Sequence, residues 1–316
     1  MRKHRKIFIC LILGVLVSIG LFMSYDLGRG WEYALRLRSV KVSAMAIISC
    51  CIAFSSVTFQ TLTNNRILTP SIMGFESVYL LLQTLLVYIF GGQTFKVLDS
   101  FDNFLLSIVC MIGFAFVLYV LIYKRGKDNI FLLVLIGLVL GILFHSLSSF
   151  MQLLIDPNDF FIIQGKMFAS FTNINKALLG YSSVILGITL IIGFWLTKYL
   201  DVISLGKDQA ISLGLDYQKM VKVFLVIIAI LVSISTALIG PITFLGILVT
   251  NLTYELMKTY KHSMIIAACC LLTAILVIGG QFLTEHLFHL STPITTVINF
   301  VGGLYFLYLL IGIKKI

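Results

Sequence analysis

Few residues in this chain could do chemistry, and the most informative are three carboxylates that stand in otherwise apolar runs. Glu76 lies near the start of one run, Glu255 lies in a short segment after Pro241, and Glu285 ends another run. An ion-coupled carrier needs ionisable groups near the middle of its helices, because a charge at the bilayer centre is costly and is kept only for a purpose. These three carboxylates lie toward helix ends, which disfavours an ion-coupled secondary transporter without excluding it.

Sequence signatures of enzymes are missing from this chain. It contains no G-x-x-x-x-G-K-[ST] loop that would cradle ATP phosphates, no G-x-S-x-G and no H-E-x-x-H. The 6 cysteines lie inside apolar runs without zinc spacing, which favours packing roles for them. The sequence therefore predicts no enzyme, no cofactor and no metal site, and a partner chain must supply any energy that is consumed.

One polar segment, residues 205–217, lies between two apolar runs that are each long enough to cross a bilayer. Small or apolar residues recur in it at helical spacing (Ala210, Leu213 and Gly214), with charged residues elsewhere. This pattern is typical of a helix that lies in a groove of another protein. A solvated helix at the membrane interface fits the pattern equally well, so both interpretations remain open.

Composition decides which elements can position these residues. Of 316 residues, 59% are hydrophobic and only 11% are charged, with a mean hydropathy of +1.07. Irregular backbone cannot face lipid, so the apolar runs must be helices of about 20 residues. The sequence predicts an all-α, polytopic transmembrane helical bundle. We expect long spans at 7–24, 41–63, 71–91, 101–123, 130–155, 176–197, 218–239 and 263–284.

The end of the chain is less regular than the rest. Gly240 and Pro241 break one run ahead of a short apolar piece at 242–257. Pro293, with Gly302 and Gly303, is expected to divide the last stretch into two short helices. Broken helices at membrane depth are tolerated where they are buried in protein or line a cavity, so these breaks point to a pathway.

The distribution of basic residues predicts the orientation of the chain. With ten spans and an inner amino terminus, the larger share of the 23 lysines and arginines falls on the inner side. The inner group includes Lys124, Arg125, Lys207, Lys314 and Lys315, and the outer group includes Arg36, Arg38, Lys41, Lys258 and Lys261. We therefore expect a multi-pass protein of the cytoplasmic membrane with both termini in the cytoplasm. The outer cluster near Arg36 could meet an acidic partner or an anionic solute, or could be scattered surface charge.

Three stretches, in order along the chain, resemble the FecCD family of ABC importer permeases. The first is residues 36–74, where the matches are Arg36, Leu37, Gln60, Asn64 or Asn65, Leu68, Pro70 and Gly74. The second joins LGKDQAISLG at 205–214 to GPITFLGILV at 240–249, and the third is INFVGGLYFLYLL at 298–310. Together they cover most of the chain, and three ordered matches are far more specific than one.

The resemblance implies a type II ABC importer permease, like that for cobalamin, with about ten transmembrane helices and one permease domain over residues 1–316. Such permeases work in pairs, with two ATP-binding cassette subunits on the cytoplasmic side and a solute-binding protein on the outer side. Within a coupling region at about 203–217, the residues expected in the ATPase groove are Gly206, Ala210, Leu213 and Gly214. Arg36 matches the first of two arginines that meet the binding protein. The second falls at Ser39, so Arg38 is the other docking candidate.

Residues 55–77 are similar to one branch of this family in particular. That branch pairs two different permease chains and imports iron bound to catecholate siderophores such as petrobactin, whereas haem and cobalamin are other cargoes of the family. Ferric catecholates are bulky and anionic, so a wide, polar and neutral path should release them readily. The candidates for this lining are Gln60, Thr61, Thr63 and Asn64, and the alternative is that they bond neighbouring helices.

The mechanism consistent with these observations is alternating access. The segment at 205–217 would move as a rigid lever when ATP closes the nucleotide-binding subunits, and the path would change the side on which it opens. The helix breaks expected beside this path are Pro70, Gly74, Gly240 and Pro241.

Overall fold

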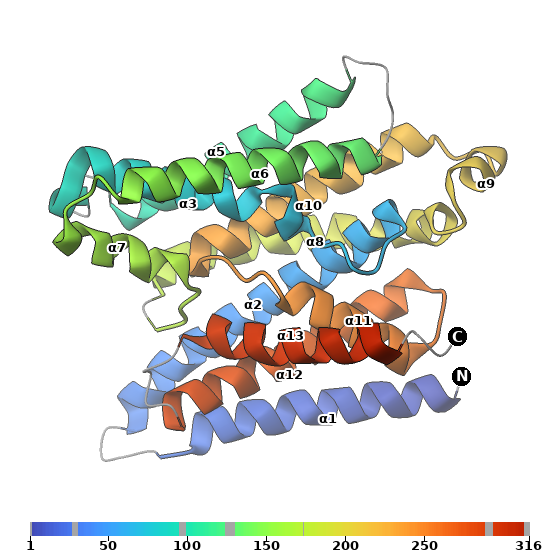
Figure 1. Ribbon diagram of the computed structural model, residues 1–316. Helices are drawn as coiled ribbons and strands as arrows, with labels where there is room; N and C mark the ends of the chain where they lie inside the picture. The colour runs from blue at the N-terminus through green and yellow to red at the C-terminus, as the bar shows by residue number, and fades with distance from the viewer. Residues whose placement is uncertain are drawn as a thin grey trace.

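The computed structural model describes residues 2–26, 31–94, 99–123, 130–172, 174–287 and 293–312. All regular elements in these residues are helices, and the long ones run lengthwise through one bundle (Figure 1). Within the described ranges, eight helices are long and apolar enough to cross a membrane, and two shorter apolar helices lie near the end of the chain. The prediction of an all-α, polytopic transmembrane bundle is confirmed.

The bundle is arranged around α2, which is the most buried of the spans. Helices α8, α10, α11 and α12 pack directly against it, while α3 packs against α5 and α6 to one side. In chain order the helices are α1 (Arg2–Ser24), α2 (Trp31–Thr63), the 3-10 helix η1 (Pro70–Met73), α3 (Phe75–Phe90), the 3-10 helix η2 (Gly91–Gln93), α5 (Ser100–Tyr123), α6 (Ile130–Gln152), α7 (Pro157–Met167), α8 (Lys176–Ile203), α9 (Lys207–Ser212), α10 (Tyr217–Ile239), α11 (Leu245–Met257), α12 (His262–His286) and α13 (Ile294–Gly312).

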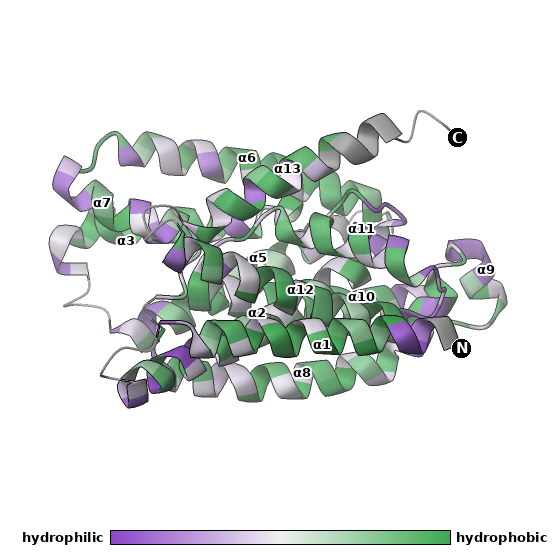
Figure 2. Ribbon diagram, turned by 90° about the horizontal axis from the view of Figure 1, so that it is seen from below, coloured by the Kyte–Doolittle hydropathy of each residue, from purple (hydrophilic) through white to green (hydrophobic). Residues whose placement is uncertain are grey.

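Polar residues gather at the two ends of the bundle and apolar residues fill the middle, as Figure 2 shows. This is the distribution that a bilayer selects, because the apolar side chains must match the hydrocarbon core. The short helix α9 projects at one end, and the amino-terminal end of α1 and the carboxyl-terminal end of α13 lie at that same end (Figure 1). We call this the α9 end of the bundle, and the other the distal end.

The second span differs from its prediction. It was expected to begin at residue 41, but α2 already begins at Trp31 and runs for 33 residues. At 1.5 Å per residue it is about 50 Å long, so it extends well beyond a hydrocarbon core of about 30 Å. The polar first turns of α2 therefore stand outside the apolar layer at the distal end, and they carry Arg36 and Arg38.

The last stretch of the chain also differs from its prediction. The expected division at Gly302 and Gly303 is wrong, because α13 runs without a break from Ile294 to Gly312. Glycine is common in transmembrane helices, where the surrounding apolar residues keep the backbone hydrogen-bonded. Pro293 precedes the helix and does not interrupt it.

Two basic residues lie at the end opposite to the one predicted. The ring and backbone nitrogens of His262 both lie 2.7 Å from Asp201 Oδ1 near the end of α8. The neighbouring Lys258 and Lys261 are therefore at the α9 end, with Lys207, because the short α11 also crosses toward that end. Lys124, Arg125, Lys314 and Lys315, on which the orientation prediction also depends, lie outside the described residues.

Glycines let the break before α3 approach α6 closely. Gly137 and Gly141 of α6 are spaced as in the small-xxx-small pattern that brings membrane helices together. A Cβ atom added to Gly141 would lie 2.9 Å from the Cα of Gly74, and one on Gly137 would lie 2.9 Å from the Met73 carbonyl oxygen. The backbone of η1 and α3 therefore rests directly on α6.

A Gly141→Val variant is expected to lower the midpoint of thermal unfolding of the purified protein. The added methyl groups must push the α3 and α6 backbones apart, and such overpacking costs roughly 1–3 kcal/mol. Gly187→Val in α8 is the matched control, because no atom lies within 4 Å of a Cβ added there. Equal unfolding midpoints for the two variants would show that the close approach of Gly74 and Gly141 does not stabilise the fold.

Candidate coupling surface and polar cavity

Two glycines delimit a short helical segment at one end of the bundle. After α8 the chain turns at Gly206, with φ +104°, forms α9 for 6 residues, and turns again at Gly214, with φ +82°. Both backbone angles lie in a region that glycine adopts at little cost and other residues do not. The helix is therefore shorter than residues 205–217, and the glycines act as its turning points.

The exposed side chains of this segment are partly different from those expected. Ala210 is fully buried, so its methyl group packs against this chain, whereas Leu213 is 65% exposed. Leu205 and Ile211 are also more than half exposed. Apolar side chains exposed together at a polar end of a membrane protein are typical of a site for a partner. Leu205 and Ile211 were missed in the sequence, where the only signal was an apolar residue just before the polar helix and another within it.

Both ends of this segment are fixed to neighbouring helices. Asp201, in the last turn of α8, accepts the His262 backbone N–H at 2.7 Å and lies equally close to its ring nitrogen. On the other side, Asp216 caps α10 by accepting the Lys219 backbone N–H at 3.1 Å. Movement of α9 would therefore be transmitted to α8, α10 and α12.

The two breaks in the transmembrane helices meet at one polar cavity. Pro70 begins η1 and Gly240, with φ +99°, follows α10, and both line a cavity of about 30 Å³. Hydroxyl groups make up most of its polar lining, and they belong to Ser55, Ser56, Thr69, Ser71, Ser235, Thr236 and Thr243. The fold thus brings together breaks that are about half the chain apart in sequence.

Glu76 is the single carboxylate at this cavity. Its Oε2 accepts a hydrogen bond from the Thr243 hydroxyl at 3.0 Å, and Ser71 also donates to it. Among the described residues, no lysine, arginine or histidine lines the cavity. Close by, the buried hydroxyl of Thr69 has no hydrogen-bond partner among the described residues. Glu76 therefore faces a hydroxyl-lined space, and no basic side chain stands beside it among the described residues that line the cavity.

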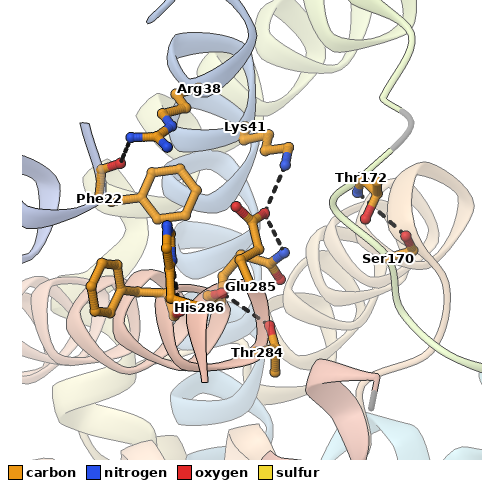
Figure 3. A network of polar contacts seen from close by, with 10 residues as sticks. Phe22, Arg38, Lys41, Ser170, Thr172, Thr284, Glu285 and His286 are labelled. Atoms are coloured by element: carbon orange, nitrogen blue, oxygen red, sulfur yellow. Dashed lines mark hydrogen bonds and ion pairs between the residues drawn. The ribbon is translucent and has the colours of Figure 1, made fainter. Parts of the chain in front are cut away.

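The other two carboxylates found in apolar runs have different surroundings. Glu285 accepts from Lys41 Nζ at 2.7 Å and from Gln281 at 2.8 Å, so it forms part of an ion pair between α12 and α2. Figure 3 shows Lys41 and Glu285 pointing toward each other. Glu255 is exposed and lies 3.5 Å from the Tyr305 hydroxyl. Their roles follow from these contacts, whereas the contacts of Glu76 leave its role open.

The four residues expected to line a path lie outside this cavity, in the last turn of α2 and directly after it. Gln60 donates to the Thr250 hydroxyl at 2.8 Å and so joins α2 to α11. The Thr61 hydroxyl donates to a carbonyl of its own helix, and Asn64 is exposed just after α2 ends. Thr63 lines a separate cavity of about 200 Å³ together with Lys207 of α9. None of the four reaches the polar cavity, which instead takes Ser55 and Ser56 from α2.

The two arginines at the distal end have different environments. Arg38 donates from one guanidinium nitrogen toward the carbonyl oxygens of Phe22, Met23 and Tyr25 at 3.1, 3.2 and 2.6 Å. These are carbonyls at the end of α1, which have no partner within the helix. Figure 3 shows Arg38 reaching the Phe22 carbonyl. Arg36 is exposed, so it remains available for a docking contact while Arg38 holds α1 to α2.

An Arg38→Ala variant is expected to lower the free energy of unfolding by about 2 kcal/mol, because hydrogen bonds to a charged group contribute roughly 1.5–3 kcal/mol. Thermal unfolding of the purified protein would measure this loss. Arg36→Ala removes the same charge two residues away and should leave the unfolding midpoint unchanged. If both variants unfold like the original protein, Arg38 does not stabilise the junction of α1 and α2.

Comparison with known proteins agrees with this architecture. A model of the FecCD transport family matches residues 7–312. The chain is 50% identical to the petrobactin import system permease protein YclO of Bacillus subtilis (strain 168), over 100% of this chain and 99% of that protein. It is 35% identical to the petrobactin import system permease protein FatC of Bacillus anthracis, over 97% and 89% respectively. A solved structure of a metal-chelate type ABC transporter in an inward-facing conformation shares the fold, with a TM-score of 0.86 at 20% identity over 99% of this chain and 100% of that one. The chain therefore belongs to the FecCD transport family and is a membrane permease subunit of an ABC transporter, not an enzyme.

Proposed function

We propose that this chain forms part of the path by which a ferric siderophore of the catecholate type, such as ferric petrobactin, is imported across the cytoplasmic membrane. The observation that carries the proposal is the 50% identity, over the whole chain, to a relative named for petrobactin import. The second relative, at 35% identity, has the same named cargo. Haem and cobalamin are the alternative cargoes if iron uptake does not depend on this chain.

ABC importer permeases work with an ATPase and a binding protein and often pair with a second permease. For this chain we assign two ATP-binding cassette subunits to the α9 end, where Leu205, Ile211 and Leu213 offer an apolar contact. The distal end, with the exposed Arg36, would receive the solute-binding protein. The second permease would be a different but homologous chain, and residues 1–316 would act as one permease domain with its coupling region at about 203–217.

The orientation that follows puts the α9 end and both termini in the cytoplasm. Lys207 lies within the coupling region, Lys198 and Lys219 flank it, and Lys258 and Lys261 also lie at this end. An excess of basic residues is typical of the cytoplasmic side. The ATPase subunits consume cytoplasmic ATP, so the same orientation is the one in which the coupling surface can reach them.

The mechanism is alternating access driven through α9. Lys207 and Thr63 line the same cavity of about 200 Å³, so α9 lies beside the end of α2. Two turns back along α2, Ser55 and Ser56 line the polar cavity at the helix breaks. Movement of α9 therefore displaces α2 relative to the breaks, and the broken segments are where the backbone can change conformation with least loss of hydrogen bonds.

Uptake of radiolabelled iron tests the cargo. We expect cells that lack this chain to lose uptake of a ferric catecholate and to keep uptake of a ferric hydroxamate, once redundant importers have been removed. Restoring the chain should restore catecholate uptake. If neither uptake changes, the iron cargo is wrong, and the same cells should then be tested with haem and cobalamin.

A further inference from the structure

An apolar groove lies between α5 and α10, away from the polar cavity and the coupling surface. Its volume is about 450 Å³, which is within the range of roughly 300–1,000 Å³ that is usual for small-molecule sites. One wall is a face of α5 with Ile112, Ala115 and Phe116, and the other is a face of α10 with Leu225 and Val226. Ile112, Phe116 and Val226 are exposed, so the groove opens at the side of the bundle.

The groove ends near the middle of the membrane. Along α10 its lining runs from Lys222 to Ile230, and the eight steps of 1.5 Å between them span about 12 Å. Half of a hydrocarbon core of about 30 Å is about 15 Å, so the groove has the depth of one leaflet. Met73 and Phe75, beside the break before α3, are buried and close its inner side. A transmembrane helix of a partner would need a contact face along the full thickness, which this groove does not offer.

A basic residue stands at the end of the groove that is nearest the α9 end of the bundle. Lys222 Nζ lies 5.3 Å from the centre of the Tyr119 ring, and both residues line the groove. Lys222 is in the second turn of α10, near the α9 end, where the apolar middle of the bundle gives way to polar residues. Lysine and tyrosine at this level are typical of the membrane interface. The groove thus combines an apolar body of leaflet depth with one positive charge at headgroup level.

We propose that this groove binds one phospholipid with an anionic headgroup, whose acyl chain fills the space between α5 and α10 and whose phosphate lies near Lys222. The chemistry fits because basic residues at the ends of transmembrane helices attract anionic lipid headgroups. The lipid would lie against both α5 and α10 beside the break before α3, so its presence would support the packing of these helices. The site does not depend on which solute is transported.

Native mass spectrometry of the assembled transporter would test this inference. The full chain with its partner subunits would be equilibrated with vesicles of equal parts phosphatidylglycerol and phosphatidylcholine and then released into mild detergent. We expect one retained phospholipid per copy of this chain, enriched about fivefold in phosphatidylglycerol, which is the effect of one basic residue at an anionic surface. Lys222→Gln should remove the enrichment, and Lys219→Gln, which removes the same charge outside the groove lining, should not.

A second pair of variants tests the apolar part of the site. Ala115→Trp would fill the groove from α5 and should abolish retention of both lipids, while Val117→Trp, on an exposed face of α5 outside the lining, should not. Equal enrichment in the two lysine variants, or no retained lipid in the original protein, would overturn the proposal. The proposal would also be overturned if Ala115→Trp no longer bound the second permease but still retained lipid, because the groove would then be a protein interface. Iron uptake is not part of these readouts, so the cargo and the lipid site can fail separately.

Discussion

A Gly214→Arg variant is expected to insert in the membrane and fold but to show no transport above background. Gly214 lies in the exposed turn after α9, and no atom lies within 4 Å of a Cβ added there, so the chain itself has room for a long side chain. An ATPase subunit that covers this turn would have to bury the new guanidinium. An unpaired charge buried at such an interface costs roughly 3 kcal/mol or more, and each 1.4 kcal/mol is a factor of about ten in affinity.

The measurement is ATP-dependent uptake by the reconstituted transporter, together with co-purification of the ATPase subunits. Gly214→Ala is the matched control, because it imposes the same φ of +82° on a residue with a Cβ but adds almost no bulk. The conformational cost of that change is about 1–2 kcal/mol, so this control should fold and retain much of its transport. Normal uptake by Gly214→Arg would exclude this turn from the contact. Equal loss in both variants would instead assign the defect to the backbone conformation.

Much of the fold could be predicted from the sequence because a bilayer leaves few alternatives. The apolar runs had to be helices, and the break at Gly240 and Pro241 could be predicted because proline cannot donate a backbone hydrogen bond. In the structure α10 ends at Gly240 and Pro241, and a second break with a short 3-10 helix lies at Pro70 to Gly74. The family resemblance added the coupling region, whose two glycines prove to be the turning points of a short helix.

What the sequence could not predict depends on contacts between distant segments. Arg38 and Arg36 look alike in the sequence, but only Arg38 lies within reach of the end of α1. Gln60 and Ser56 are both polar residues in one apolar helix, yet Gln60 is used to bond α11 and Ser56 lines the polar cavity. Gly302 and Gly303 were expected to end a helix that in fact continues, because local propensity is a weak signal where lipid forces the backbone to stay hydrogen-bonded.

A Glu76→Lys variant is expected to reduce catecholate uptake by about tenfold or more. We propose the polar cavity, with its hydroxyl lining and the two helix breaks, as a second candidate for the path beside the four residues first expected there. If an anionic ferric siderophore passes this point, Glu76 offers it no positive charge to bind. A lysine would attract it instead. Two unit charges 4 Å apart interact by roughly 4 kcal/mol at an effective dielectric constant of 20, which is enough to delay release.

Glu76→Gln separates this interpretation from the secondary carrier that the sequence left open. The amide keeps the size of the side chain and can still accept from Thr243, so in an ATP-driven permease it should retain most of its uptake. In an ion-coupled carrier, the loss of this carboxylate should abolish uptake, and a proton-conducting uncoupler should do the same to the unmodified protein. Uptake by Glu76→Lys equal to that by Glu76→Gln would mean that the siderophore does not pass the polar cavity. The path would then have to be sought nearer Thr63 and the end of α2.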